Sequence, residues 1–185
     1  MICIVGKSCS GKDSVTKELI NYFGYSKLIT TTTRPIRPNE QDGVDYHFIS
    51  IENFLNKLSQ DYFLEFRFYE TKLGIWFYGS SFSSYQTANN NTIAILTPSG
   101  LKKLKEHDIN CTSFYINVSD ETIKQRQIER GDKLEEAERR FNADKLDFVG
   151  INNMVDYVID NENRDISEVA KEIDKLYKGS LKKGE

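Results

Sequence analysis

The sequence contains little cysteine, histidine, proline and tryptophan, and it has no long hydrophobic run. Its 185 residues include three Cys, two His, three Pro and one Trp. Because Cys3, Cys9 and Cys111 form no CxxC pair, we predict neither a disulfide framework nor a zinc site, but reduced thiols in a cytoplasmic protein. No segment approaches the roughly 20 apolar residues of a membrane span. The apolar start at 1–5 has no basic stretch before it, so we expect no signal peptide.

A strong net charge is also absent. The 25 Lys and Arg against 28 Asp and Glu give a formal charge of −3. General nucleic-acid binders normally have a strongly basic face, so we expect no nucleic-acid partner, and we expect no membrane partner either. The length, with 38% hydrophobic and 29% charged residues, is typical of a soluble globular domain. The oligomeric state stays open between monomer and homodimer.

Strand-like and helix-like patterns alternate along the chain. The sequence predicts strands at 1–5, 27–30, 62–69, 76–78, 93–96, 114–118 and 155–159. It predicts helices that end at Gly24 and that begin at the caps Ser50, Thr97, Ser119 and Asp165. This alternation favours an α/β fold with a mostly parallel central sheet, covered by helices on both faces. The aromatic strands of 45–80 indicate an inserted lobe, and 178–185 is predicted to be a frayed tail.

A phosphate-binding motif lies at the start of the chain. Residues 6–12 fit G-x-x-x-x-G-K between a predicted strand and a predicted helix, which is the context of a P-loop. Backbone amides and the helix N-terminus would hold phosphate oxygens there, although a simple glycine turn with exposed lysines is the alternative. The candidate phosphate-binding residues are Gly6, Lys7, Ser8, Cys9, Ser10, Gly11, Lys12, Asp13 and Ser14.

Asp13 stands where this motif normally has Ser or Thr. A carboxylate beside phosphates repels them unless a metal or an arginine intervenes. We therefore predict that Asp13 holds magnesium, through water.

The eight arginines are unevenly placed. Arg34 and Arg37 lie in a proline-bearing loop, and four more lie within 126–140. The planar guanidinium group suits bidentate binding of phosphate. Arg126 and Arg130 are four residues apart and share one helix face. The alternative is a solvated helix in which these arginines form ion pairs with Glu129, Glu135, Glu136 and Glu138.

Residues 32–48 resemble the monophosphate-binding loop of guanylate kinases, TTRxxRxxExxGxDYxF. The matching residues are Thr32, Thr33, Arg34, Arg37, Glu40, Gly43, Asp45, Tyr46 and Phe48. Segments 63–65, 78–80, 125–140 and 158–161 resemble further family motifs, in family order. The resemblance implies a three-layer P-loop NTPase fold. It divides the chain into a core of residues 1–30, 81–125 and 150–185, a GMP-binding lobe of 31–80 and an arginine-bearing lid of 126–149.

The resemblance implies phosphorylation of GMP to GDP with ATP and Mg²⁺. The catalytic residues would be Lys12, Arg126, Arg130 and Arg140, and Asn161 would join the ATP site near the adenine. GMP would be held by Thr30, Arg34, Arg37, Tyr46, Glu65, Tyr78, Ser80 and Thr97. A carboxylate such as Glu65 suits guanine because N1–H and the exocyclic amine are adjacent donors. Without the family context, Glu65 could instead pair with Arg67 across strands.

The sequence departs from the family pattern at two further places. The Asp-x-Asp that usually follows the third core strand is replaced by Ile95 and Thr97, of which Thr97 can still accept a hydrogen bond. The spacing from Glu65 to Tyr78 predicts an insertion around 69–74. Three alternatives therefore stay open: use of dGMP, a broader (deoxy)nucleoside monophosphate kinase, and a catalytically inactive guanylate-kinase-like module that binds peptides. A P-loop GTPase is disfavoured because the sequence has no N-K-x-D motif.

Overall fold

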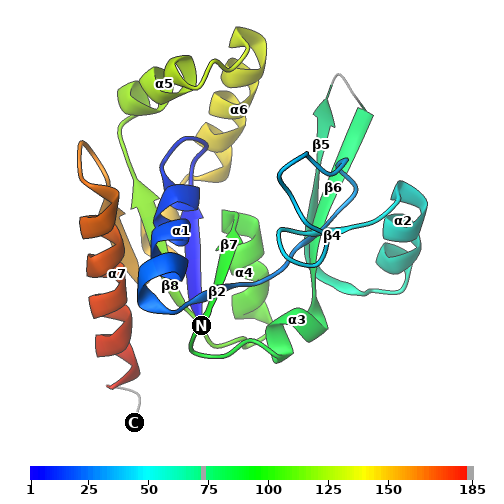
Figure 1. Ribbon diagram of the computed structural model, residues 1–185, viewed down its shortest axis with the longest axis horizontal. Coiled ribbons are helices and arrows are strands. Elements are labelled where there is room, and N and C mark those ends of the chain that lie inside the picture. Colours follow the sequence, from blue (N-terminus) through cyan, green and yellow to red (C-terminus); the bar gives the residue numbers. More distant parts are fainter. Residues whose placement is uncertain (72–73, 183–185) are drawn as a thin grey trace.

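A five-stranded parallel sheet forms the centre of the computed structural model, which describes residues 1–71 and 74–182 (Figure 1). Its strand order is β2-β7-β1-β8-β9, and every neighbouring pair is parallel. The strands are β1 (Ile2–Gly6), β2 (Ser26–Lys27), β7 (Thr92–Leu96), β8 (Thr112–Asn117) and β9 (Tyr157–Asp160). All five residues of β1 are buried, as expected for the middle strand of a sheet covered on both faces. The predicted α/β fold with a mostly parallel sheet is confirmed.

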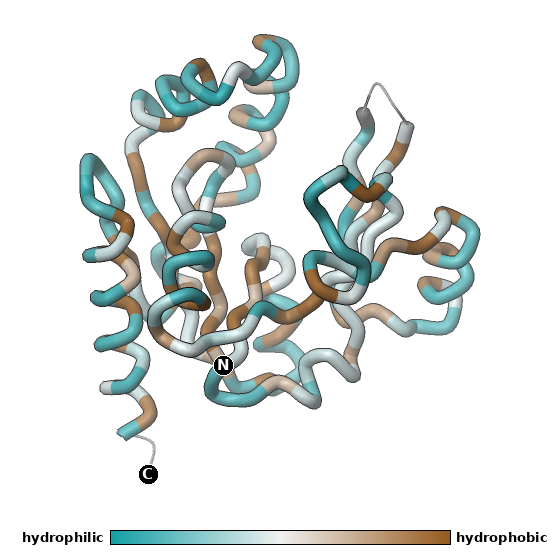
Figure 2. Tube along the Cα trace, viewed as in Figure 1, coloured by the Kyte–Doolittle hydropathy of each residue, from teal (hydrophilic) through white to brown (hydrophobic). Residues whose placement is uncertain are grey.

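Helices cover both faces of this sheet and make three layers. On one face, α1 (Lys12–Phe23) and α7 (Ile166–Leu181) pack over Ile2 and Ile4 of β1. On the other, α4 (Pro98–Glu106) packs over Cys3 and Val5. Hydrophobic residues accordingly concentrate on the central strands, while the helices carry much hydrophilic surface (Figure 2). Among the described helices, none has the length and apolarity to cross a bilayer.

A second sheet of four strands stands beside the core (Figure 1). Its order is β4 (His47–Phe48), β3 (Thr31–Thr32), β6 (Gly74–Ser81) and β5 (Phe63–Thr71). Helix α2 (Ile51–Ser59) packs on it through Phe54, whose ring stacks on that of Phe63 at 4.3 Å between centroids. The short helix α3 (Phe82–Gln86) leads back to the core. The long hairpin β5–β6 therefore rests on an aromatic base and projects toward the P-loop side of the molecule.

Two helices and a 3-10 turn lie between β8 and β9. These are α5 (Asp120–Glu129), α6 (Leu134–Asp147) and η1 (Ile151–Asn153). Helix α5 ends at Glu129, and Gly131, the residue after its C-cap, adopts the left-handed conformation at φ 73°. The charged segment after Gly131 forms α6. Its C-cap residue, Phe148, buries its ring in the core.

The four predicted helix N-caps are confirmed. The side chains of Ser50, Thr97, Ser119 and Asp165 each accept a hydrogen bond from a backbone N–H of the following turn.

Two sequence predictions of local structure are wrong. The strand expected at 27–30 ends at Lys27, because the chain there crosses to the second sheet, where Thr31 and Thr32 pair with β6. The tail expected from residue 178 continues α7 to Leu181, since Leu181 packs against the core beside buried Tyr177. Residues 183–185 lie outside the described residues.

The predicted insertion around 69–74 falls partly on residues 72–73, which also lie outside the described residues. On either side of them, the strands β5 and β6 stay paired, with Tyr69 opposite Trp76 and Glu70 opposite Ile75.

Candidate active site

A cavity of about 430 Å³ opens between the P-loop, the β5–β6 hairpin and α6. The predicted site residues in its wall are Gly6, Ser8, Cys9, Lys12, Asp13, Thr30, Arg37, Tyr46, Glu65, Tyr78, Thr97, Arg130 and Arg140. The predicted residues outside its wall are Lys7, Ser10, Gly11, Ser14, Arg34, Ser80, Arg126 and Asn161. The structure therefore brings candidate donor-site and acceptor-site residues together around one space.

The P-loop makes its turn where the motif places glycines. Gly11, the N-cap of α1, has φ 96°, and a Cβ there would lie 2.5 Å from Asn161 Nδ2. A Cβ at Gly6 would lie 2.4 Å from Ser10 Oγ. The left-handed conformation of Gly11 favours glycine there, while a Cβ at Gly6 would require the buried Ser10 side chain to move. Glycine at both positions lets the loop turn closely, as phosphate binding by backbone amides requires.

Arg126 and Asn161 contact the backbone of the P-loop from outside the cavity wall. Asn161 is fully buried, and its Nδ2 donates to the carbonyl oxygen of Ser10 at 2.8 Å. Arg126 donates from Nη1 to the carbonyl oxygens of Cys9 and Ser10, both at 3.2 Å, and from Nη2 to that of Asn161 at 3.1 Å. In this conformation both side chains fix the loop backbone, and their direct contact with a nucleotide stays a prediction.

Lys12 is the lysine at the N-terminus of α1, and its ammonium group turns toward the loop. Its Nζ donates to the carbonyl oxygen of Lys7 at 3.3 Å. Burial lowers the pKa of Lys12, while the carboxylates of Asp13 and Asp144 oppose that shift. Lys7 itself faces away from the cavity and pairs with Asp120 at 2.8 Å. Lys12 is thus the P-loop cation available to phosphates.

At the other side of the cavity, Glu65 presents a desolvated carboxylate. Burial raises the pKa of Glu65, although hydrogen bonds with Ser80, its partner across the β5–β6 pair, act in the opposite direction. The hydroxyls of Ser80 and Thr30 lie 3.4 Å apart. These three side chains form a small polar group that can accept adjacent N–H donors and offer hydroxyls beside them.

The two arginines of the proline-bearing loop have different surroundings. Arg34 is only 5% exposed, and its Nη2 contacts Glu40 Oε1 at 2.6 Å while Nη1 donates to the carbonyl oxygen of Pro35 at 2.8 Å. The other Glu40 oxygen accepts from the backbone N–H of Arg37 at 2.9 Å. Hydrogen bonding from Arg34 lowers the pKa of Glu40. Arg34 therefore stabilises the loop, and Arg37 faces the cavity.

The end of β7 contributes no carboxylate to the cavity. Ile95 and Thr97 are in its wall, and Thr97 Oγ1 already accepts from the backbone N–H of Gly100 at 3.2 Å. Within residues 1–71 and 74–182, no three His, Cys, Asp or Glu side chains are grouped to hold a metal.

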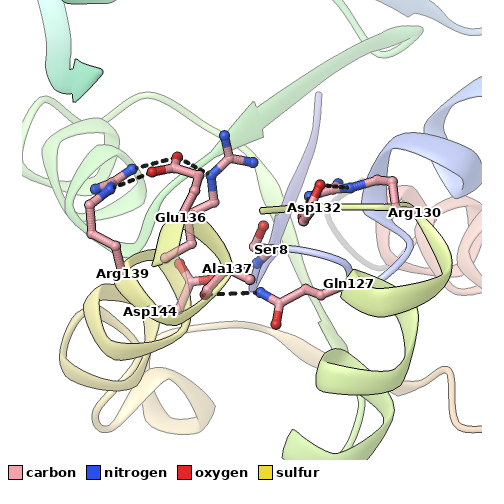
Figure 3. Close-up of polar contacts among 9 residues, drawn as sticks. Ser8, Gln127, Arg130, Asp132, Glu136, Ala137, Arg139 and Asp144 are labelled. Atoms are coloured by element: carbon pink, nitrogen blue, oxygen red, sulfur yellow. Dashed lines mark hydrogen bonds and ion pairs between the residues drawn. The ribbon is translucent and has the colours of Figure 1, made fainter. Parts of the chain in front are cut away.

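Acidic residues of the segment 126–149 pair with its arginines (Figure 3). Arg130 binds Asp132 through two N–H groups, while Arg139 and Arg140 both bind Glu136, at 2.8 and 2.7 Å from their Nε atoms. Hydrogen bonds from Arg139 first, and from Arg140, lower the pKa of Glu136 to about 2. These arginines thus already have carboxylate partners in the part of the structure where phosphates would otherwise attract them.

Comparison with known proteins identifies the family. The guanylate kinase family model matches residues 1–178. The guanylate kinase of Helicobacter hepaticus (strain ATCC 51449 / 3B1) is 34% identical over 174 residues, which cover 88% of this chain and 82% of that protein. The guanylate kinase of Prochlorococcus marinus subsp. pastoris is 30% identical, with 96% of each chain covered. The chain belongs to the guanylate kinase family.

The likeness extends to three dimensions. The crystal structure of guanylate kinase from Anaplasma phagocytophilum superimposes with a TM-score of 0.64 at 25% identity, covering 97% of this chain and 85% of that one. The three-layer P-loop NTPase fold expected from the sequence motifs is therefore confirmed.

Several cavity residues of this guanylate kinase family member were not among the sequence predictions. They are Lys27, Arg67, Tyr69, Trp76, Ile95, Leu96, Glu136, Arg139, Ala143, Asp144, Asp147 and Phe148. Those of α6 recur every three or four residues, which is the spacing of one helix face. Residues three or four positions from the predicted Arg140, and then from each other, share its helix face. The sequence could have predicted the α6 residues from this spacing.

Among them, Asp144 makes a direct contact with the P-loop. Its Oδ2 accepts from the backbone N–H of Ser8 at 2.6 Å (Figure 3). Burial raises the pKa of Asp144, whereas the hydrogen bond from Ser8 and the charge of Lys12 lower it. A carboxylate of α6 thereby already accepts the hydrogen bond of a P-loop amide that a phosphate could otherwise receive.

We expect Asp144→Asn to bind magnesium-free ATP about tenfold more tightly, because the variant loses a negative charge that repels phosphates and competes for the Ser8 N–H. Isothermal titration in the presence of EDTA measures this change. Asp108→Asn, the same change at an exposed turn after α4, is the matched control. Unchanged or weaker ATP binding by Asp144→Asn would contradict this competition.

Proposed function

We propose that this member of the guanylate kinase family transfers the γ-phosphoryl group of ATP to GMP, giving ADP and GDP. The observation that carries the proposal is one cavity lined both by the P-loop lysine, Lys12, and by the buried carboxylate of Glu65. Phosphoryl transfer requires positioning and charge neutralisation more than covalent chemistry. The wall of this cavity offers both.

For the donor, we assign ATP to the P-loop residues 6–14. Lys12 attracts the outer phosphates, and the loop amides hold the phosphate oxygens. Arg130 and Arg140 exchange their lid carboxylates for ATP and neutralise charge on the transferred group. Arg126 and Asn161 keep the loop in shape, and we assign them to the ATP site on the family motif.

For the acceptor, we assign guanine to Glu65, Ser80, Thr30 and Thr97. The Glu65 carboxylate accepts from N1–H and the exocyclic amine, a pair of donors that adenine lacks. The phosphate of GMP is assigned to Arg34, Arg37, Tyr46 and Tyr78. This arrangement points the GMP phosphate toward the P-loop, so that its oxygen can attack the γ-phosphorus in line.

Magnesium fits the donor set through Asp13. Its exposed carboxylate lies in the cavity wall next to Lys12, with no ion pair to any described residue. Mg²⁺ commonly takes one or two carboxylates together with substrate phosphates and water. When bound, it neutralises charge on the phosphates and orients them.

We expect Asp13→Asn to raise the magnesium concentration for half-maximal rate about tenfold, since an amide holds a water-bridged cation less strongly than a carboxylate. Magnesium titration at fixed free ATP measures it, with Asp108→Asn at the exposed turn after α4 as control. An unchanged midpoint would remove Asp13 from this role.

The proposed division of labour assigns the phosphate site to a core (1–30, 81–125 and 150–185), GMP to a lobe (31–80) and the closing arginines to a lid (126–149). Closure of lobe and lid on the core would exclude water and limit hydrolysis of ATP. The three free cysteines support a cytoplasmic location. We expect a monomer or homodimer, with neither nucleic-acid nor membrane partners.

The test is an ADP-release assay with ATP, magnesium and a panel of GMP, dGMP, AMP, CMP, UMP and dTMP. Turnover of GMP, with or without dGMP, supports the proposal. Similar rates for several bases would favour a broader nucleoside monophosphate kinase. This second candidate is suggested by Ile95 and Thr97, which replace the usual aspartates. No turnover with any acceptor would favour an inactive binding module.

A further inference from the structure

Arg67 enters the cavity from the middle of β5. Along this strand Glu65, Arg67 and Tyr69 are half-buried, whereas the intervening Phe66 and Phe68 are 45% and 55% exposed. Because successive side chains of a strand point to opposite faces, Arg67 shares the cavity face with Glu65. Across the hairpin it pairs with Tyr78, and it lies in the cavity wall with Tyr78 and Tyr69.

The Arg67 guanidinium is oriented but retains free donors. Its Nη1 donates to the Tyr69 hydroxyl at 2.9 Å, and no carboxylate of the described residues lies within ion-pair distance. Arg130, Arg139 and Arg140, by contrast, each have an acidic partner. An arginine has five N–H donors, so most of those on Arg67 can still bind a ligand.

The charge of Arg67 reaches both ends of the cavity. Burial lowers the pKa of Lys12, and Arg67 adds to that shift. Burial raises the pKa of Glu65, and Arg67 opposes that shift. The charge of Arg67 thus acts both on the P-loop lysine and on the carboxylate assigned to guanine, the two groups between which the acceptor's phosphate would lie.

Only one arginine of the monophosphate loop lines the described cavity. Arg34 lies beside the wall tyrosines Tyr46 and Tyr78 but is not itself in the cavity wall. Arg37 is therefore the one arginine of the monophosphate loop in the wall. A monophosphate carries about two negative charges and three terminal oxygens, and it is bound best by more than one guanidinium.

We propose that Arg67 binds the phosphate of the acceptor nucleotide together with Arg37, at the part of the cavity wall that Tyr69 and Tyr78 line. This inference rests on the proposed function, since it names a further phosphate ligand at the same acceptor site. The Tyr69 hydroxyl holds the guanidinium plane so that its remaining N–H groups can form a bidentate contact. Arg67 is therefore a binding residue for the non-transferred phosphate of the acceptor.

The test compares GMP with guanosine, which has the same base and sugar but no phosphate. Isothermal titration is made on the full chain, on Arg67→Gln and on Arg67→Lys. We expect Arg67→Gln to weaken GMP binding about thirtyfold, the effect of losing charge-assisted hydrogen bonds, and to leave guanosine binding unchanged. The GMP affinity of Arg67→Lys, which keeps the charge but loses the planar guanidinium, should fall between those of the parent chain and Arg67→Gln. Arg164→Gln on the outer side of the core, paired with Glu172, is the matched control.

Each other outcome overturns the inference. Equal losses for GMP and guanosine would mean that Arg67 contacts the base or supports the pocket. Unchanged GMP binding would mean that it contacts no ligand. If the parent chain binds neither GMP nor guanosine, the proposed function itself fails, and the parent measurement alone shows this. In kinetics, we expect the KM for GMP to rise while the KM for ATP stays constant.

Discussion

Replacing Lys12 by methionine is expected to lower kcat for phosphoryl transfer about 10³-fold. Lys12 is the P-loop cation that faces the cavity, and the loss of one preorganised charge at a transferring group typically costs about 4 kcal/mol of transition-state stabilisation. Methionine keeps the length of the side chain, so the helix start should be retained. Single-turnover kinetics with saturating ATP and GMP measure the effect.

Stability separates this role from a structural one. Burial lowers the pKa of Lys12, so the charged ammonium group costs folding free energy at neutral pH. Lys12→Met should therefore melt at the same temperature as the parent or higher. Lys17→Met, at an exposed position of the same helix, is the control and should keep full activity. A kcat within tenfold of the parent, or a large fall in Tm, would contradict the assignment.

Glu65→Gln is expected to lower kcat/KM for GMP by about two to three orders of magnitude. The amide turns a donor toward guanine where the carboxylate offers two acceptors, and a buried unpaired donor costs a further penalty. IMP, which lacks the exocyclic amine, should lose less than GMP does. Steady-state rates with both acceptors measure the difference, and Glu52→Gln on the exposed side of α2 is the control. Equal losses for GMP and IMP would contradict the contact with the amine.

The same residue predicts a pH dependence. Burial raises the pKa of Glu65, so in the free enzyme its carboxylate takes up a proton at a higher pH than an exposed glutamate does. The protonated form accepts hydrogen bonds from guanine poorly. The affinity for GMP should consequently be full above this raised pKa and fall as the pH drops through it. Binding measured between about pH 4.5 and 8 tests the direction, and in Glu65→Gln this component should disappear.

What could be predicted from the sequence depends on how local the determining contacts are. The P-loop occupies consecutive residues between a strand and a helix, and the four N-caps act within one turn, so both were predicted. The Ser8–Asp144 contact joins residues 136 positions apart and follows no local pattern. The strand expected at 27–30 failed for the same reason, because tertiary pairing of Thr31 with Gly79 takes the chain to the second sheet.

The two arginines of the monophosphate loop show a second limit. Arg34 and Arg37 are equivalent in the motif, and only the folded loop shows that Glu40 binds the side chain of one and the backbone of the other. Motif spacing thus predicts which residues belong to the site but not the partner that each of them has. The same limit applies to Arg126. The motif predicts it as a catalytic residue, and only the folded chain shows that its guanidinium donates to backbone carbonyl oxygens.

The pairing of the lid arginines has a consequence for the response to salt. Arg130, Arg139 and Arg140 already face Asp132 and Glu136, so an arriving phosphate exchanges one anion for another and releases the carboxylates to water. Nucleotide binding therefore releases fewer bound counterions from these arginines than it would if the arginines had no carboxylate partners. Nucleotide affinity should therefore fall only slightly as ionic strength rises. A cluster of unpaired arginines would lose much more affinity over the same range, because salt screens its charges.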